Sequence, residues 1–308
     1  MNSKLLPLMS TALFIMPWSM ASNASAQDSI TAVAVDSHLV SLIGALTDGK
    51  FEQMDILSRD NIPAAMLSRE VRVGVSARRW TDLEVAKFEK LTGYRPTELY
   101  FTADVVAVLA NEENPNQEVT LQQLRDVFGC NDDVLPTRWS TWGEETETPL
   151  MLPFAVDEGL KLHHTFHEWV TCKEGTYAAT QFVADEEGLE EVLDDNEQAL
   201  AYVTYSKRWQ EANILSVVDD RGDRYDVNKE TILSGRYPLS SVYYLYLDLP
   251  PHRNYFSPSE KQFIELALSQ EHQSVLNRYG FISLPEQAIW RNYVKLGLEP
   301  PIVEGGYK

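Results

Sequence analysis

One stretch of the chain, Glu98–Gly129, restricts the fold more than any other. It contains an almost uninterrupted apolar run, Val105–Ala110, which is rich in β-branched residues and typical of a strand buried on both faces of a sheet. An Asn-Pro-Asn turn at 114–116 ends the strand, because proline cannot continue a hydrogen-bonded ladder. Thr120 then has the character of an N-cap for a helix that Gly129 closes. The stretch therefore predicts one α/β unit.

Similar patterns predict further elements on both sides of this unit. Thr31–Val35 has the pattern of a first strand, and a helix follows it. Eight acids between positions 181 and 199, with apolar residues at helical spacing, predict a solvated acidic helix. Ser257 and Glu260 predict a capped helix near the C-terminus. The chain is therefore expected to be α/β throughout.

Three blocks, in this order, resemble the phosphate-binding branch of the periplasmic solute-binding proteins. They are the stretch above, the glycine and Tyr-Pro-Leu segment within 232–247, and the segment 268–285 with its Tyr-Gly-Phe. The resemblance implies a two-lobed α/β fold, with two mixed sheets flanked by helices and joined by two crossing strands. It places lobe one at 27–108 plus 242–308, and lobe two at 109–241.

Members of that family bind their ligand between the lobes and deliver it to a membrane transporter. The resemblance therefore implies a substrate-binding protein for an ABC transporter, with inorganic phosphate or a similar oxyanion as ligand and an inner-membrane permease as partner. It implies no enzyme activity and no cofactor. The alternative is a diverged binding protein with a different ligand or none, acting as a sensor or scaffold.

Residues 1–26 predict a cleaved secretory signal peptide. Lys4 gives a positive start, 12–16 an apolar core, and Ala24-Ser25-Ala26 a cleavage site. The apolar core is too short, and too close to Pro17, to span a bilayer. We therefore expect a mature protein that starts at Gln27, does not insert into the membrane, and lies in the periplasm or outside the cell. We also expect it to be a monomer.

The strong negative charge excludes one group of partners. The chain has a formal net charge of −20, and removal of Lys4 with the leader makes it −21. Nucleic acid and anionic membranes require clustered basic residues, so neither is an expected partner. A small anion is still compatible with this charge, because a buried anion site is determined by its local donors.

Cys130 and Cys172 are the only cysteines. An even pair in an exported chain predicts one disulfide, and the alternative is two free buried thiols. The bond would close a loop of roughly 40 residues and destabilise the unfolded chain by about 3–4 kcal/mol.

Candidate ligand donors follow the early strands. Ser37 follows the first strand and begins a helix, whose free backbone amides favour an anion; an ordinary N-cap is the alternative. Ser58 and Arg59 follow the second strand, where the resembled family has a Gly-Ser-rich turn. Ser76 and Arg78 end the third strand and supply a hydroxyl and a guanidinium, which suit a tetrahedral oxyanion.

For Arg78 the alternative role is a surface ion pair with Glu84. Asp104, before the crossing strand, is a candidate acceptor for the proton of hydrogen phosphate, which would discriminate against fully ionised anions; a structural cap is its alternative.

The segment 150–166 departs from the family pattern. The resemblance implies an Arg and a Ser-Gly-Thr turn here, but Asp157 and Glu158 stand where donors are expected. Two carboxylates would repel phosphate. Either Lys161 and His163 replace the missing donors, or the ligand has changed or been lost.

The histidines of this segment offer an alternative role, a metal site. His163 and His167 are four residues apart, with Glu168 beside the second, and this spacing on a helix can hold zinc. The motif is not H-E-x-x-H, and no third ligand is identifiable, so we expect no metal. A secreted metal-dependent hydrolase is therefore only a remote alternative.

Overall fold

The computed structural model describes residues 31–48, 54–129, 137–140, 147–157, 163–171, 179–251, 256–269 and 273–300. The predicted signal peptide, Lys161 and the cysteine pair Cys130 and Cys172 lie outside these residues. Both predictions about them, the cleaved leader and the disulfide, stay predictions.

A first sheet is formed mainly by the early strands and by one late strand that inserts among them. Its order is β2-β1-β3-β12-β4; β1 is parallel to β2 and β3, whereas β12 is antiparallel to both of its neighbours. Short β13 also pairs with β4. The strands are β1 (Thr31–Asp36), β2 (Met54–Arg59), β3 (Val73–Ser76), β4 (Thr97–Ala110), β12 (Ser240–Leu247) and β13 (Phe281–Ile282).

A second sheet continues from the far half of β4. Its order is β4-β8-β6-β7, with β8 antiparallel to β4 and parallel to β6, and with β9 also paired to β4. A small third sheet has the order β11-β10-β5. The strands are β5 (Glu118–Thr120), β6 (Leu152–Val156), β7 (Gln181–Val183), β8 (Ala199–Thr204), β9 (Asn213–Ile214), β10 (Ser216–Val218) and β11 (Arg224–Tyr225).

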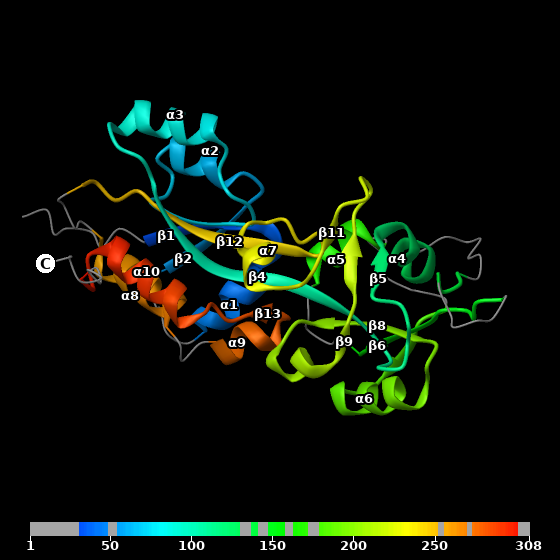
Figure 1. The fold of residues 1–308 in the computed structure, drawn as a ribbon. Coiled ribbons are helices and arrows are strands. Elements are labelled where there is room, and N and C mark those ends of the chain that lie inside the picture. Colours follow the sequence, from blue (N-terminus) through cyan, green and yellow to red (C-terminus); the bar gives the residue numbers. More distant parts are fainter. Residues whose placement is uncertain are drawn as a thin grey trace, which may run out of the picture. The chain divides into compact units, whose positions relative to one another are not determined.

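The long strand β4 belongs to both sheets, as Figure 1 shows. Thr97–Val105 pairs with β12 and Val106–Ala110 pairs with β8, so β4 passes from the first sheet to the second at Val105–Val106. Ala107 and Leu109 pack in one apolar cluster, while Val106 and Val108 pack in another. The prediction of a crossing strand buried on both faces is therefore confirmed.

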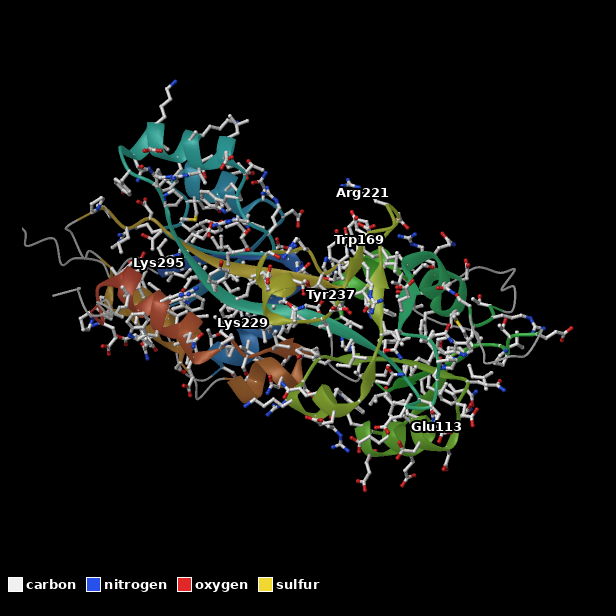
Figure 2. The ribbon with its side chains drawn as sticks, in the orientation of Figure 1. Glu113, Trp169, Arg221, Lys229, Tyr237 and Lys295 are labelled. Atoms are coloured by element: carbon white, nitrogen blue, oxygen red, sulfur yellow. The ribbon has the colours of Figure 1, made fainter. Side chains whose placement is uncertain are left out.

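The chain returns to the first sheet beside this crossing point. The Val106 amide donates to the carbonyl of Leu239 at 3.0 Å, and the hydroxyl of Tyr237 donates to the Val106 carbonyl, also at 3.0 Å. Tyr237 is buried in the interior (Figure 2), and its burial raises its pKa, so the hydroxyl stays protonated and remains a donor. The Tyr-Pro-Leu segment thus holds the return connection against β4 before β12 begins.

Helices cover the sheets and carry the capping signals expected from the sequence. Thr120 and Gln123 form a capping box at α4, and Ser257 and Glu260 form one at α8. The elements are α1 (Val40–Thr47), α2 (Ile62–Leu67), α3 (Asp82–Thr92), α4 (Leu121–Phe128), α5 (His164–Trp169), α6 (Glu186–Asp195), α7 (Lys229–Leu233), α8 (Pro258–Leu268), α9 (Gln273–Arg278) and α10 (Glu286–Leu296), with 3-10 turns η1 (Ser37–Leu39) and η2 (Lys207–Glu211). No helix in the described ranges is long and apolar enough to cross a membrane.

Candidate functional site

The candidate site lies where β1 and β3 end beside the crossing strands. The two strands are parallel, so their carboxyl ends meet at one edge, the usual place for ligands on such sheets. The backbone amide of Ala77, after β3, donates to a carboxylate oxygen of Asp36, the last residue of β1, at 3.4 Å. This contact holds the two strand ends together and directs a carboxylate to the edge.

Helix α5 packs its first turn onto both crossing strands. Asp104 on β4 and Ser241 on β12 are directly paired across the sheet, and Thr165 of α5 contacts both of them. The Thr165 amide donates to Asp104 Oδ2 at 3.1 Å, and its hydroxyl donates to Ser241 Oγ at 2.8 Å. Thr165 therefore joins α5 to the first sheet at the crossing point.

Asp104 is a buried carboxylate with an unused acceptor. Its exposed fraction is 1%, and Oδ1 has no hydrogen-bond partner among the described residues. Nδ1 of the buried His163 lies 3.9 Å from Oδ1, which is beyond hydrogen-bond distance. A buried acceptor without a donor is costly, so this oxygen is suited to a ligand that brings its own proton.

Two histidines stack beside this carboxylate. The rings of His38, in η1, and His164, the first residue of α5, have centroids 4.1 Å apart and planes at 15°. His38 Nδ1 lies 2.9 Å from Asp36 Oδ1, and His38 Nε2 lies 3.3 Å from the Tyr243 hydroxyl. We call Asp36, His38, Asp104, His164, Thr165, Ser241 and Tyr243 the junction cluster.

Burial controls the protonation of two members of the junction cluster. Burial, and next the neighbouring His38, lower the pKa of His164, although Glu168, Asp104 and Asp36 act in the opposite direction. Burial, and then the charge of Asp104, raise the pKa of Tyr243 well above its ordinary value. At neutral pH the cluster therefore contains a neutral His164 and a Tyr243 hydroxyl that still carries its proton.

Three of the predicted ligand residues lie at this edge. Asp104 belongs to the junction cluster, while Ser37 is exposed on η1 between Asp36 and His38. Ser76 is buried at the end of β3, where its hydroxyl donates to the carbonyl of Arg78 at 2.8 Å. Ser37 makes no side-chain cap contact, since the N-cap of η1 is Asp36. Contact between these residues and a ligand stays a prediction.

The two predicted arginines each have a carboxylate partner. Arg59 contacts Glu70, with Nε to Oε2 at 3.2 Å, and Ser58 is exposed beside it on β2. Arg78 makes two hydrogen bonds with Glu84, at 2.9 and 2.7 Å, which is the surface ion pair foreseen as its alternative role. This pair lowers the pKa of Glu84 to about 2 and raises that of Arg78, to which Asp36 also contributes.

The histidine spacing that suggested a metal is not realised on one helix face. Helix α5 begins at His164, so His163 precedes it, with a left-handed backbone (φ 33°) and a buried ring edge-on to Tyr202. His167 Nδ1 lies 2.8 Å from the hydroxyl of Thr171. Within the described parts of the chain, no group of three or more His, Cys, Asp or Glu residues is placed to hold a metal ion.

Most of the junction cluster was missed by the sequence analysis. His38 and Tyr243 are separated by about two hundred residues, and only the placement of β12 beside β3 and β4 brings them into contact. Thr165 and Ser241 carry no motif of their own. The one available signal was a polar triplet, Asp36–His38, directly after a buried strand.

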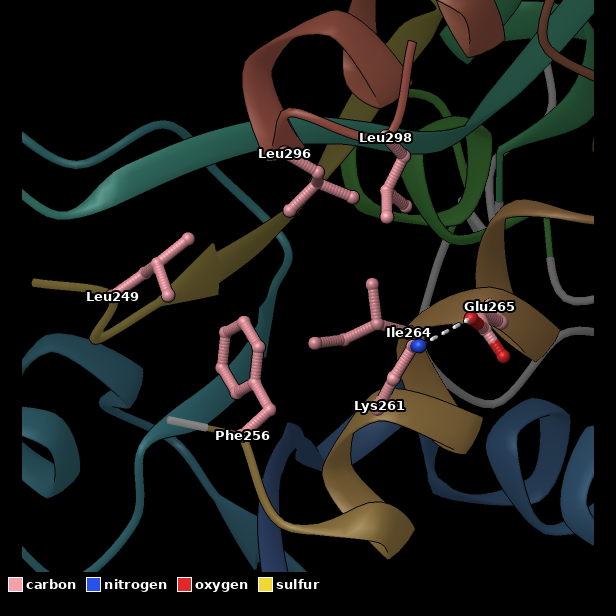
Figure 3. A pocket seen from close by; sticks show the side chains of 7 residues that line it. All are labelled: Leu249, Phe256, Lys261, Ile264, Glu265, Leu296 and Leu298. Atoms are coloured by element: carbon pink, nitrogen blue, oxygen red, sulfur yellow. Dashed lines mark ion pairs between the residues drawn. The ribbon is translucent and has the colours of Figure 1, made fainter. Parts of the chain in front are cut away.

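A small pocket elsewhere has the wrong chemistry for an oxyanion. It contains none of the junction cluster, and its two charged side chains, Lys261 and Glu265, form an ion pair with each other at 3.7 Å, as Figure 3 shows. The remaining lining is apolar and comes from α8, from α10 and from residues outside the helices and strands. We therefore place the candidate site at the junction cluster. The pocket is lined by Leu249, Phe256, Lys261, Ile264, Glu265, Leu296 and Leu298.

The two sheets and the strands that cross between them define the class of the protein: a two-lobed α/β fold of the periplasmic-binding-protein type. The family model described as the PBP superfamily domain matches residues 44–271, which is most of the chain. The chain therefore belongs to the PBP superfamily.

Individual relatives agree with this assignment. The chain is 27% identical over 262 residues to the phosphate-binding protein PstS of Pseudomonas aeruginosa, which covers 80% of this chain and 78% of that protein. The structure of a possible phosphate binding protein from Planctomyces limnophilus has a TM-score of 0.59 at 18% identity, with 87% of this chain and 97% of that one covered. PstS from Borrelia burgdorferi has a TM-score of 0.50 at 16% identity, with 84% and 100% covered. At these identities the structural matches concern the fold.

Proposed function

We propose that this protein is a solute-binding protein that captures a small oxyanion, with phosphate as the expected ligand, for an ABC transporter. The ligand would be held at the junction cluster, between lobe one (27–108 and 242–308) and lobe two (109–241). Binding would involve closure of the lobes and no chemical step. Export to the periplasm and delivery to an inner-membrane permease belong to the same proposal.

The observation that carries the proposal is the Asp104 oxygen Oδ1, which accepts no hydrogen bond from any described residue. The other oxygen of Asp104 accepts the amide of Thr165, so the carboxylate is fixed in place and Oδ1 is an acceptor of defined direction. Hydrogen phosphate and dihydrogen phosphate each have a P–OH group that can donate to it. The sequence relative from Pseudomonas aeruginosa is named as a phosphate-binding protein, which supports the same ligand.

The direct test is calorimetric titration of the protein with phosphate, after partial unfolding and refolding to remove any bound ligand. We expect saturable one-to-one binding and a rise in melting temperature, because a ligand that binds only the folded state stabilises it. No heat and no thermal shift would contradict the proposal.

A substitution at Arg78 tests its predicted ligand role. We expect Arg78→Ala to weaken phosphate binding by about tenfold, the effect of losing one hydrogen bond to a charged group. Arg79→Ala is the matched control, since Arg79 is also an exposed arginine paired with a carboxylate, that of Glu98. Equal phosphate affinities for both variants and the parent protein would leave Arg78 as a surface ion pair with Glu84.

One observation favours the second candidate, a diverged binding protein with a different small ligand or none. The described polar groups of the junction cluster include two carboxylates, and the two arginines predicted as ligand donors already pair with acids. Under this alternative, phosphate gives no heat while the fold and its melting transition are retained.

A further inference from the structure

The contact between His38 and His164 joins two parts of the fold that are distant in sequence. His38 lies in η1, directly after β1 of the first sheet, and His164 begins α5, which follows β6 of the second sheet. We propose that these stacked imidazoles form a proton-operated clasp, which holds α5 against η1 while His164 is neutral and opens when both rings are protonated.

The closed clasp requires that at least one of the two imidazole rings is neutral. Two rings with centroids 4.1 Å apart and nearly parallel planes stack favourably unless both are charged, because two cations at that distance repel. Asp36 lies 2.9 Å from His38 Nδ1, so a proton on His38 has a carboxylate partner. Among the described residues, the carboxylate paired with His164 is that of Glu168, which is 59% exposed and lies 3.9 Å from Nε2. The second proton, on His164, is therefore the unfavourable one.

The charged and titratable groups around the clasp come from four elements. Asp36 belongs to β1, Asp104 to β4, Tyr243 to β12, and Glu168 to α5. The buried His163 lies directly before α5. The three acids favour a protonated His164, but burial and the neighbouring His38 outweigh them, so that its pKa is lowered. Tyr243 does not titrate in this range, since burial raises its pKa.

The sign of the pH effect follows from that lowered pKa. The open state, with an ordinary histidine pKa of about 6.5, takes up a proton more readily than the closed state. The clasp is therefore fully stabilised above about pH 6.5 and is weakened as the pH falls toward the lowered pKa of His164. Acid thus loosens the contact between α5 and η1. Thr165, which follows His164 in α5, donates its backbone amide to Asp104 and would be affected as well.

Hydrogen exchange of the ligand-free protein tests the clasp without any reference to phosphate. Protection of the α5 amides, corrected for the intrinsic pH dependence of exchange, is compared between about pH 8 and about pH 5, on either side of the ordinary histidine pKa. We expect a severalfold loss of protection at the lower pH in the parent protein. His167→Gln, on the same helix but bonded to Thr171, should behave like the parent.

His164→Phe keeps an aromatic ring in the stack and removes the titration, so its α5 protection should not change between the two pH values. A parent protein without the pH response, or a His164→Phe variant with an undiminished one, would overturn the proposal.

A second readout remains informative if His164→Phe fails to fold. Ring-proton NMR of the parent should show His164 titrating below an ordinary histidine, and His38→Phe should move that titration upward, since it removes the opposing charge. An unchanged His164 titration in His38→Phe would show that the two rings are not coupled.

Discussion

Replacing Asp104 by Asn is expected to weaken phosphate binding by about ten- to a hundredfold, the range for losing a hydrogen bond between a donor and a charged acceptor. The side chain keeps its shape and one oxygen that can accept the Thr165 amide, so the fold at the crossing point should be preserved. What is lost is the second carboxylate oxygen, Oδ1, which has no partner among the described residues and is the acceptor assigned to the P–OH group. The measurement is calorimetric titration with phosphate.

The affinity for sulfate is measured alongside that for phosphate, because sulfate has no proton to donate at neutral pH. The parent protein should prefer phosphate strongly, since the carboxylate would repel a fully ionised anion, and Asp104→Asn should reduce this preference. Asp126→Asn is a control for the change of one charge; Asp126 lies on α4 and accepts from Gln122. If Asp104→Asn binds phosphate as tightly as the parent, Asp104 is only a structural link to α5.

The largest effect on stability is expected from Phe166→Ala. Phe166 has no exposed surface, stacks on Tyr202 with ring centroids 4.2 Å apart, and meets Phe128 edge-on at 5.8 Å. Removing such a ring from a packed core costs about 3–5 kcal/mol, as lost transfer energy and as a cavity that the surroundings only partly fill. Urea unfolding monitored by fluorescence or circular dichroism gives the free energy of unfolding.

The same substitution should also weaken ligand binding, because Phe166 fixes the helix turn that carries His164 and Thr165. Phe182→Ala is the matched control: Phe182 is 52% exposed on the edge strand β7, and its loss should change the free energy of unfolding by no more than about 0.5 kcal/mol. A Phe166→Ala variant as stable as Phe182→Ala would contradict the packing described for α5.

The strands and helices with strong local signals were predictable from the sequence. The run Val105–Ala110 has no polar side chain on either face, which predicts a strand buried on both sides. The corresponding part of β4 is buried throughout. The cap at Thr120 and the acidic helix α6, which buries Leu189 and Leu193, follow from side-chain chemistry within one turn. Such features depend on neighbours three or four residues away, and the sequence displays them directly.

The candidate site was predictable only in part. Ser76 and Asp104 were identified because each stands at the end of, or beside, a recognisable strand. The sequence could not show that Arg78 would pair with Glu84, because an arginine near a strand end has the same local pattern whether it meets a ligand or a surface carboxylate. The spacing of His163 and His167 was misleading for a related reason: helix α5 starts one residue later than the pattern implied.

The sequence by itself determined the fold class, the crossing strand and the capped helices, because hydrophobic periodicity and capping are local properties of the chain. Tertiary structure decided which polar groups meet at the crossing point. His38, Asp104, His164 and Tyr243 come from η1, β4, α5 and β12, and their contacts depend on the order of strands in the sheet and on how α5 packs on both crossing strands. These are contacts between residues far apart in the chain, and no local pattern encodes their distances or the burial that shifts the pKa values of His164 and Tyr243.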